Sequence, residues 1–283
     1  MSVDFTHPLA VKIRKQIVEA IAQYNLIEAD DRVMVCCSGG KDSSILLALL
    51  TEIQRRAPYD YHVEAVMLDQ WQPGFDAKLF SSWVESLGAK LTILNRDTYS
   101  IVKEKVSSGV YCSMCSRLRR GILYDHAFEN RFSKMALGHH RDDLSETLLM
   151  NLFYTGKLSA MPPKLKSDDG RNVLIRPLSF VAEKDLLELS QVWNFPIIPC
   201  NLCGSQEGMK RQRTKKLIRD LEKEIPQIGN SMLKAMGNVH QSQLLDQSLW
   251  DFQNLRADGV EVKTGIDHFS GNELDPDKSE LLF

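Results

Sequence analysis

The chain has 283 residues, of which 43% are hydrophobic and 25% are charged, with a net charge of −2. This composition is ordinary for a globular protein, and no apolar run approaches the ~20 residues that a membrane-spanning helix needs. The first nine residues lack the apolar core of a signal peptide. We therefore expect a cytoplasmic protein with no membrane partner. The charge is uneven, because nine acids and three bases from Leu244 onward give −6, which leaves +4 for the rest.

Hydrophobic periodicity divides the first 200 residues into alternating helices and strands. The expected helices cover 8–24, a segment ending near 55, 76–87, 98–106, 116–128, 144–153 and 183–193. The expected strands cover 33–37, 62–68, 90–94, 134–137 and 173–175. Strands that alternate with helices predict an α/β fold, in which helices cover both faces of a parallel sheet.

The composition changes toward the C-terminal end. Residues 161–170, with two prolines and an Asp-Asp-Gly sequence, predict a loop or hairpin. From Gln206 the chain is helical in pattern and highly charged, and from Ser242 the periodicity is weak. We therefore expect a main domain over 1–205, a small helical part over 206–241 and an acidic, poorly ordered tail over 242–283.

A glycine-rich turn follows the first expected strand and opens the next helix. It reads Ser38-Gly39-Gly40-Lys41-Asp42-Ser43. Glycines permit positive φ and close backbone approach, and a helix start offers unpaired N–H groups to an anion. A Walker loop would need Ser or Thr in place of Asp42, and no G-x-G-x-x-G sequence is present. The turn instead resembles the pyrophosphate loop of N-type ATP pyrophosphatases; the alternative is an ordinary glycine-rich turn.

Several polar residues at this turn have expected roles. Ser38, Ser43 and the loop amides would hold pyrophosphate oxygens, and Lys41 would add positive charge. Asp42 is best explained by a Mg²⁺ ion that bridges it to phosphate, with a solvated surface aspartate as the alternative. Asp69 ends the second expected strand, where nucleotide contact competes with a capping or turn role.

A second polar turn, Gly138-His139-His140-Arg141-Asp142-Asp143, directly follows the fourth expected strand. The adjacent carboxylates of Asp142 and Asp143 are candidate catalytic groups, able to hold Mg²⁺ or orient a substrate proton. The alternative is that both acids merely begin the next helix, whose dipole favours negative charge there. Ligand sites of parallel sheets form at the carboxyl ends of the strands, so we expect the two turns, Asp69 and the first cysteine pair to share one edge.

The chain has six cysteines, Cys36, Cys37, Cys112, Cys115, Cys200 and Cys203. The first two lie on the expected buried strand and are interpreted as core residues. The other four form two pairs with two intervening residues each, and 84 residues separate the pairs. Four thiolates suit structural zinc or an iron–sulfur cluster, with unligated thiols as a third interpretation. Zinc ribbons usually place their pairs ~15–20 residues apart, so the wide gap favours a site built into the active centre.

Basic residues gather after each cysteine pair. The first group is Arg117, Arg119 and Arg120, and the second is Lys210, Arg211, Arg213, Lys215, Lys216 and Arg219. A solvated helix face is the usual explanation of such a run. Placement beside both cysteine pairs favours contacts with a nucleic-acid phosphate backbone.

Together these motifs resemble the tRNA 2-thiocytidine synthetase family. The matching stretches are 38–43, 112–121, 138–143, 161–164 and 199–206. The resemblance runs from about Ile17 to Val239 and leaves the acidic tail outside. It implies a pyrophosphate-loop fold of the adenine nucleotide alpha hydrolase-like type. It also implies ATP-dependent 2-thiolation of cytidine at position 32, in the anticodon loop of tRNA.

The resemblance further implies a [4Fe–4S] cluster held by Cys112, Cys115 and Cys203, which leaves Cys200 spare. Adenylation would activate the C2 oxygen of the base and release pyrophosphate. Sulfur from a cysteine desulfurase would then displace AMP. With three protein ligands, one iron stays open and could carry the incoming sulfide.

Three further residues belong to the expected site. Gly138 and His139 are assigned to the nucleotide site, and Arg119 to steadying substrate or the adenylate. The resemblance also implies a homodimer, for which no stretch of the sequence gives a physical argument.

Two other functions compete with this hypothesis. One is a different pyrophosphate-loop tRNA-modifying enzyme, of the thiouridine or lysidine type, which would use two-cysteine persulfide chemistry in place of the cluster. The other is a zinc-stabilised RNA-binding protein whose loop is vestigial. Iron and acid-labile sulfide in anaerobically purified protein would separate the cluster from zinc.

Overall fold

The structure is a computed structural model that describes residues 3–71, 76–105, 111–198 and 206–257. Its contacts divide the chain into two compact units, Met1–Asn238 and Val239–Phe283. The first unit contains the sheet and the α-helices that the described residues form.

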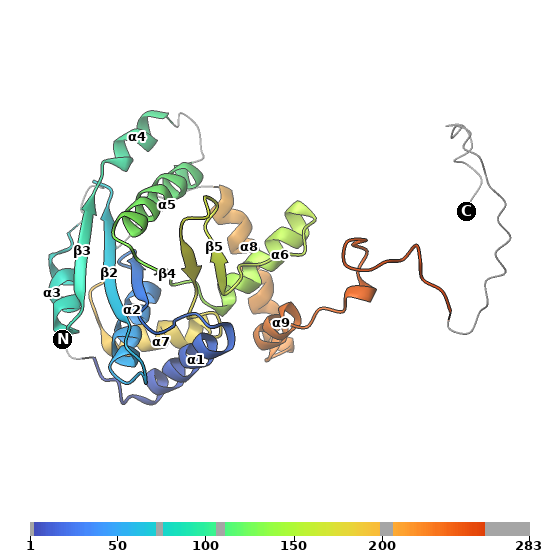
Figure 1. Cartoon of the computed structure of the whole chain (residues 1–283), viewed down its shortest axis with the longest axis horizontal. Coiled ribbons are helices and arrows are strands. Elements are labelled where there is room, and N and C mark those ends of the chain that lie inside the picture. The colour runs from blue at the N-terminus through green and yellow to red at the C-terminus, as the bar shows by residue number, and fades with distance from the viewer. Residues whose placement is uncertain (1–2, 72–75, 106–110, 199–205, 258–283) are drawn as a thin grey trace. The chain divides into compact units, whose positions relative to one another are not determined.

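Six strands form one sheet in the order β3-β2-β1-β4-β6-β5 (Figure 1). They are β1 (Arg32–Cys37), β2 (His62–Asp69), β3 (Lys90–Asn95), β4 (Lys134–Ala136), β5 (Lys164–Lys166) and β6 (Val173–Ile175). β1 pairs in parallel with β2 and β4, so Val35 lies opposite Ala65 on one side and Ala136 on the other. The chain builds the sheet outward in opposite directions from β1 and β4. Their carboxyl ends therefore form the crevice where parallel sheets bind ligands.

Helices cover both faces of the sheet, as predicted. Alternate residues of β1 face opposite sides, with Val33 and Val35 in a larger core and Met34 in a smaller one. The larger core is covered by α1 (Pro8–Tyr24), α2 (Lys41–Gln54), α3 (Lys78–Ser86) and α7 (Glu183–Trp193). The smaller core is covered by α5 (Tyr111–Glu129), against which α4 (Thr98–Lys105) packs.

Three further helices pack against one another: α6 (Arg141–Thr155), α8 (Gln206–Glu224) and α9 (Ile228–Met236). Figure 1 shows α6 extending to one side of the sheet next to α8. The buried residues of α6, such as Leu144 and Glu146, all lie in its first six positions, and its last four residues are exposed. An apolar helix expected over 144–153 therefore buries only its beginning.

The expected elements are largely confirmed, and the differences have local causes. α5 begins at Tyr111 rather than at 116, so Cys112 and Cys115 lie inside the helix and not in a loop before it. Asp76 precedes α3 because its carboxylate accepts a 2.8 Å hydrogen bond from the Lys78 N–H. Residues 161–170 take part in a hairpin, since β5 pairs antiparallel with β6. The sheet is therefore parallel except at this edge.

The second unit is described over residues 239–257. It contains one 3₁₀ helix, Gln241–Gln243, followed by turns such as the one in which Asp246 accepts hydrogen bonds from Ser248. Most of the expected tail, from 258 onward, lies outside the described residues. Because α8 and α9 belong to the first unit, the contacts divide the chain after Asn238. The three parts expected over 1–205, 206–241 and 242–283 stay a prediction.

Among the helices that the structure describes, none has the length and apolar content to cross a membrane.

Candidate functional site at the carboxyl ends of the strands

The glycine-rich turn joins β1 to α2 at the carboxyl edge of the sheet. Gly39 adopts φ +78°, in the left-handed region that favours glycine, and Gly40 is extended. Gly40 is also the N-cap of α2, and it has no side chain with which to cap the first amides of the helix. A helix start with glycine at its cap is the backbone arrangement that binds phosphate groups.

Two serines hold the shape of this turn. Ser43 is buried, and its hydroxyl donates to the Gly40 carbonyl and accepts from the Ser38 N–H, both at 3.2 Å. The exposed Ser38 hydroxyl accepts the Gly40 N–H at 3.3 Å. Lys41 Nζ donates to both carboxylate oxygens of Asp42, at 2.9 and 3.0 Å. Ser43 thus shapes the turn from inside, whereas Ser38 stands at its open side.

Two neighbouring segments approach the turn so closely that they require glycine. A Cβ on Gly138, which lies two residues beyond β4, would stand 2.9 Å from Ser43 N and 3.2 Å from Ser43 Cα. A Cβ on Gly39 would stand 2.7 Å from Cβ of Ile198, whose N–H donates to the Gly39 carbonyl at 2.9 Å. The structure therefore brings the turn after β4 into backbone contact with the glycine-rich turn, as expected of a shared edge.

The end of β2 supplies further polar groups. The Asp69 carboxylate accepts the Trp71 N–H at 2.8 Å, which is the turn role considered as the alternative to nucleotide contact. The next residue, Gln70, is buried, and its side-chain oxygen accepts the Thr98 hydroxyl and the Cys115 thiol, each at 3.1 Å. Gln70 therefore holds Cys115 beside the end of β2. The sequence prediction missed Gln70, although a polar residue directly after a buried strand signals such a position.

Cys115 is the expected cluster ligand whose side chain is described. Cys112 lies three residues earlier in α5, a spacing that puts both positions on one side of a helix. Cys203 and the spare Cys200 lie outside the described residues. Within the described ranges, no group of three or more His, Cys, Asp or Glu side chains is arranged to hold a metal ion.

Cys36 and Cys37 are both on β1, one facing each core. Burial raises the pKa of Cys36 to about 12, although the nearby positive charge of Arg119 opposes this shift. Burial also raises the pKa of Cys37 above its ordinary value. Both are therefore protonated at neutral pH, in keeping with the core role predicted for them.

Arg119 is exposed on α5, in the same helix as Cys115.

The carboxylates of the turn after β4 both bind helix starts. Asp143 and His140 form a capping box for α6: the Asp143 carboxylate accepts the His140 N–H at 3.1 Å, and His140 Nδ1 accepts the Asp143 N–H at 3.4 Å. The Asp142 carboxylate accepts the Glu183 N–H of α7 at 2.7 Å, and Arg141 donates to its other oxygen at 3.2 Å. The helix-start role considered for both acids is therefore present, and a catalytic role stays a prediction.

The buried Glu146 of α6 anchors α8. Arg211 donates through Nε to the Glu146 carboxylate at 2.9 Å, and its Nη2 lies 3.5 Å from Asp143. Burial raises the pKa of Glu146, and the positive charge of Arg211 opposes the shift. One member of the second basic group thus fixes the helix through ion pairs with α6.

Glu183, at the start of α7, links the glycine-rich turn to α8. Its carboxylate lies 2.6 Å from Lys215 Nζ and 3.8 Å from Lys41 Nζ. Burial alone would raise the pKa of Glu183, but the two lysines lower it below its ordinary value. Lys41 is therefore shared between Asp42 and Glu183.

His139 lies beside these charges as a neutral ring. Burial lowers its pKa to about 4, and Arg176 and Arg211 add to the effect while Asp143 opposes it. Its Nδ1 is buried and makes no hydrogen bond within the described part of the chain. A neutral imidazole here can donate or accept a hydrogen bond but adds no charge to the site.

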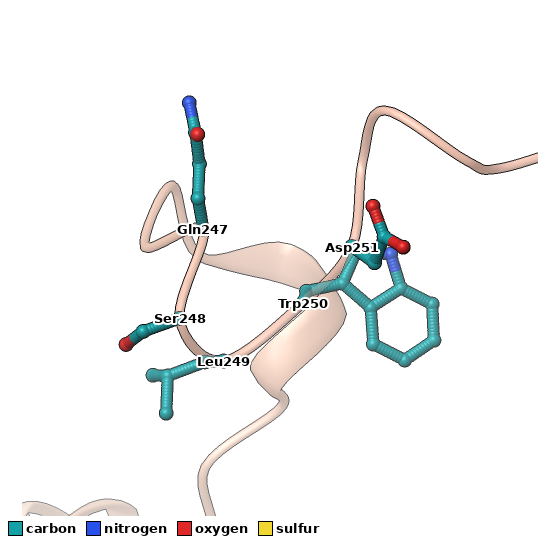
Figure 2. Close-up of a pocket in the computed structure, with 5 residues that line it drawn as sticks. All are labelled: Gln247, Ser248, Leu249, Trp250 and Asp251. Carbon is teal, nitrogen blue, oxygen red and sulfur yellow. The ribbon is translucent and has the colours of Figure 1, made fainter.

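Hollows in the described units include the following two. One, of about 160 Å³, lies between α6, α7 and α8 and is lined by charged residues that include Asp142, Glu183 and Lys215. The other, of about 360 Å³, lies in the second unit and is lined by the five consecutive residues from Gln247 to Asp251 (Figure 2). Those five residues are all exposed and follow one another along the chain.

Comparison with known proteins agrees with this geometry. Residues 9–196 match the PP-loop domain family, so a phosphate-loop protein is the class that the fold and the turn define. A tRNA-cytidine(32) 2-sulfurtransferase of Bdellovibrio bacteriovorus is 64% identical over 256 residues, covering 90% of this chain and 99% of the relative. One from Coxiella burnetii is 52% identical over 248 residues, covering 87% and 97%. The chain therefore belongs to the tRNA-cytidine(32) 2-sulfurtransferase family of PP-loop proteins.

A solved structure supports the fold. The U34-tRNA thiolase NcsA from Methanococcus maripaludis, determined with its [4Fe–4S] cluster, superposes with a TM-score of 0.67. The two sequences are 21% identical, and the match covers 86% of this chain and 85% of the thiolase. The fold expected from the sequence is confirmed.

Proposed function

We propose that the protein is an ATP-dependent tRNA sulfurtransferase that replaces the C2 oxygen of cytidine 32 with sulfur. The observation that carries the proposal is the meeting of two features at one sheet edge. A phosphate-type turn follows β1, and Cys115 is held by Gln70 at the end of the adjacent β2. The acceptor comes from the relatives, whose similarity spans both features.

The glycine-rich turn would bind the phosphates of ATP. Its amides at the start of α2 offer N–H donors, and Ser38 adds an exposed hydroxyl. Lys41 would move from Asp42 to a phosphate oxygen, which leaves the Asp42 carboxylate able to bind Mg²⁺. Asp69, Gly138 and His139 would complete the nucleotide site.

The described residues fit a cluster held by Cys112, Cys115 and Cys203. The positions of Cys112 and Cys115 lie on one side of α5, and the Cys115 thiol donates to the side-chain oxygen of Gln70 at the end of β2. The thiolase of similar fold has a [4Fe–4S] cluster. When bound, such a cluster would supply an open iron coordination position for sulfide.

The chemistry divides into two substitutions. In the first, the C2 oxygen of cytidine attacks the α-phosphate of ATP, and the bond between the α- and β-phosphates breaks to release pyrophosphate. In the second, sulfide attacks C2, and the C2–O bond breaks to release AMP. The amides of the turn would stabilise the negative charge that builds on the phosphates. Asp142 and Asp143 would assist metal or proton handling, and Arg119 would steady the adenylate.

The proposal includes three partners. The substrate is tRNA, bound through its anticodon loop, and a cysteine desulfurase supplies the sulfur. The protein acts as a homodimer in the cytoplasm. The basic residues that remain exposed on α8 argue for tRNA as the substrate, because not all of them are needed to hold the helix in place.

The test is mass spectrometry of tRNA nucleosides. The full chain, purified anaerobically, is incubated with unmodified tRNA, ATP, Mg²⁺ and sulfide, and the digest is analysed for 2-thiocytidine. We expect one thiolated cytidine per substrate tRNA with wild-type protein and none with Cys115→Ser. Thiolated uridine, or no thiolation of any base, would reject the proposed acceptor.

The metal content tests the cluster separately. We expect brown protein with iron and acid-labile sulfide, and a loss of both in Cys115→Ser. The matched control is Cys36→Ser, because Cys36 lies on β1 and is protonated. Colourless, active protein with stoichiometric zinc would contradict the cluster.

A further inference from the structure

The C-terminal end of α6 presents an exposed apolar surface that the catalytic scheme does not use. Phe153 and Tyr154 are 54% and 44% exposed, and Leu152 and Leu158 beside them are also exposed. Leu152, Phe153 and Tyr154 stand on the helix that begins at the turn after β4, and Leu158 follows the end of that helix. At 1.5 Å per residue, Tyr154 lies ~16 Å along α6 from Asp143. The surface is therefore within reach of a large substrate bound at the sheet edge.

This surface is held in a fixed conformation. Gly156 ends α6 in the left-handed region, and the Asn151 carbonyl accepts the Lys157 N–H at 3.1 Å. The Asn151 side chain donates to the carbonyl and hydroxyl of Ser159 at 2.8 and 3.0 Å. The segment after the helix is thereby tied back onto it. A surface ordered in advance loses less conformational entropy when a ligand binds.

The described charged side chains next to the surface are positive. Residues 147–163 include Lys157 and no aspartate or glutamate. Lys210 of α8 places its Nζ 5.0 Å from the centre of the Tyr154 ring, and Arg213 lies exposed three residues further along the same helix. The acids of α6 stand at its other end, where Asp142, Asp143 and Glu146 are paired. A polyanion would meet the cations Lys157, Lys210 and Arg213 here.

We infer that this surface, formed by Leu152, Phe153, Tyr154, Lys157 and Lys210, binds unpaired nucleotides of the RNA substrate. Exposed aromatic rings stack on unpaired bases, and lysines beside them contact phosphates. This inference rests on the proposed function and adds a second contact region outside the reaction centre.

A second copy of the chain is the other occupant to consider. In a two-fold symmetric dimer the same surface would face itself, and the lysines of both copies would come together. Like charges opposed in this way are destabilising. Charge therefore favours RNA over self-association at this surface.

The test measures RNA affinity by fluorescence anisotropy with the full chain, in the absence of ATP. One probe is a 17-nucleotide hairpin with a seven-nucleotide unpaired loop (about the size of an anticodon arm), and the other is a fully paired duplex of equal charge. We expect Tyr154→Ala and Phe153→Ala each to weaken hairpin binding by about fivefold or more, and duplex binding much less. Lys210→Met should weaken both and lower the salt slope by about one, and Lys210→Arg should restore binding.

The matched control lies at the end of α5. Phe128 is also 54% exposed and has a cation over its ring, because Arg171 lies 5.3 Å from the ring centre. Arg171, however, is paired with Asp125 and Asp169, so the local charge is not positive. Phe128→Ala should leave both affinities unchanged.

Three results would overturn the inference: unchanged hairpin affinity in the α6 variants, equal losses for hairpin and duplex in Tyr154→Ala, or a variant that changes the oligomeric state by light scattering. The proposed function fails by a different observation, namely the absence of 2-thiocytidine from tRNA treated with wild-type protein. Wild-type thiolation with unaltered variant affinity would reject the surface alone.

Discussion

Two neighbouring strands, β1 and β4, end in turns that each begin a helix, and the two turns differ in where their polar groups point. In the turn after β1, glycine occupies the cap of α2, and the Ser38 hydroxyl is exposed. In the turn after β4, His140 caps α6, and Asp142 and Asp143 both accept hydrogen bonds from helix starts. One turn leaves donors available to a ligand, whereas the other satisfies its charges within the protein.

The difference assigns ligand binding to the turn after β1 and the fixing of helix starts to the turn after β4. The turn after β1 has the geometry of an anion site before any anion is bound. The turn after β4 fixes the start of α6 and α7, and through Arg211 it also fixes α8. Any part that Asp142 or Asp143 takes in the reaction requires these acids to keep or exchange those partners. The following variants test this division.

Gly138→Ala should have the largest effect, because Gly138 is where the two turns touch. The added Cβ would stand 2.9 Å from Ser43 N, a backbone atom that cannot move alone, so the phosphate-binding turn must shift. A shift of ~1 Å at such a site costs about 10²-fold or more in rate. We expect no measurable ATP binding by calorimetry and no thiolation.

Gly121→Ala is the matched control for that variant. Gly121 lies in α5, and an added Cβ meets no described heavy atom within 4 Å. Because alanine favours helix by ~0.8–1.0 kcal/mol over glycine, stability should rise slightly and ATP affinity should not change. Equal ATP binding in both variants would show that the contact between the turns is not needed.

Asp142→Asn separates the supporting role from the catalytic one. The asparagine oxygen can still accept the Glu183 N–H, but the amide NH2 replaces the oxygen that accepts from Arg141, so the free energy of unfolding should fall by about 1–2 kcal/mol. The charge is lost, and if Asp142 handles a metal or proton, thiolation should slow by about 10²-fold. Single-turnover thiolation rates and urea unfolding measure the two quantities. A rate that falls only in step with stability would leave Asp142 with a supporting role alone.

The turn after β1 could be predicted from the sequence because its signal is local. Consecutive glycines between an apolar strand and a helix need no distant partner to be recognised. The parallel sheet could be predicted for the same reason, because segments with strand periodicity alternate with segments of helix periodicity along the sequence. The shared edge of the two turns follows from the strand order, which that alternation constrains.

The partners of the turn after β4 could not be predicted in this way. Asp142 meets Glu183, which lies 41 residues later, and Glu146 meets Arg211, 65 residues later. Such pairs depend on how α7 and α8 pack, because helix periodicity indicates the buried face of each helix but not which residues of two helices lie opposite one another. The sequence pattern places the start of this helix at 116, after the cysteine pair, whereas α5 begins at Tyr111 and includes Cys112 and Cys115.

Arg211→Met tests whether the supporting turn holds α8. Its loss leaves the buried Glu146 carboxylate without its cation, which should lower the free energy of unfolding by about 1–3 kcal/mol. Because burial raises the pKa of Glu146, the loss should shrink as the pH falls and protonation removes the buried charge. Arg213→Met, an exposed position on the same helix, should stay within ~0.5 kcal/mol of wild type. Urea unfolding of the wild type and both variants measures these free energies. Equal effects of the two variants would contradict the role of Arg211 in holding α8.

His139 should have the smallest effect, visible only in acid. Its pKa is lowered from 6.5 to about 4 by burial, so between these values the unfolded chain binds a proton that the native protein does not. Its contribution to stability is therefore complete above about pH 6.5 and is lost as the pH falls toward 4. The melting temperature of wild-type protein should fall more steeply across this window than that of His139→Asn. His62→Asn, at an exposed position, should follow wild type, and parallel curves for all three would mean that the His139 ring is not protected from protonation.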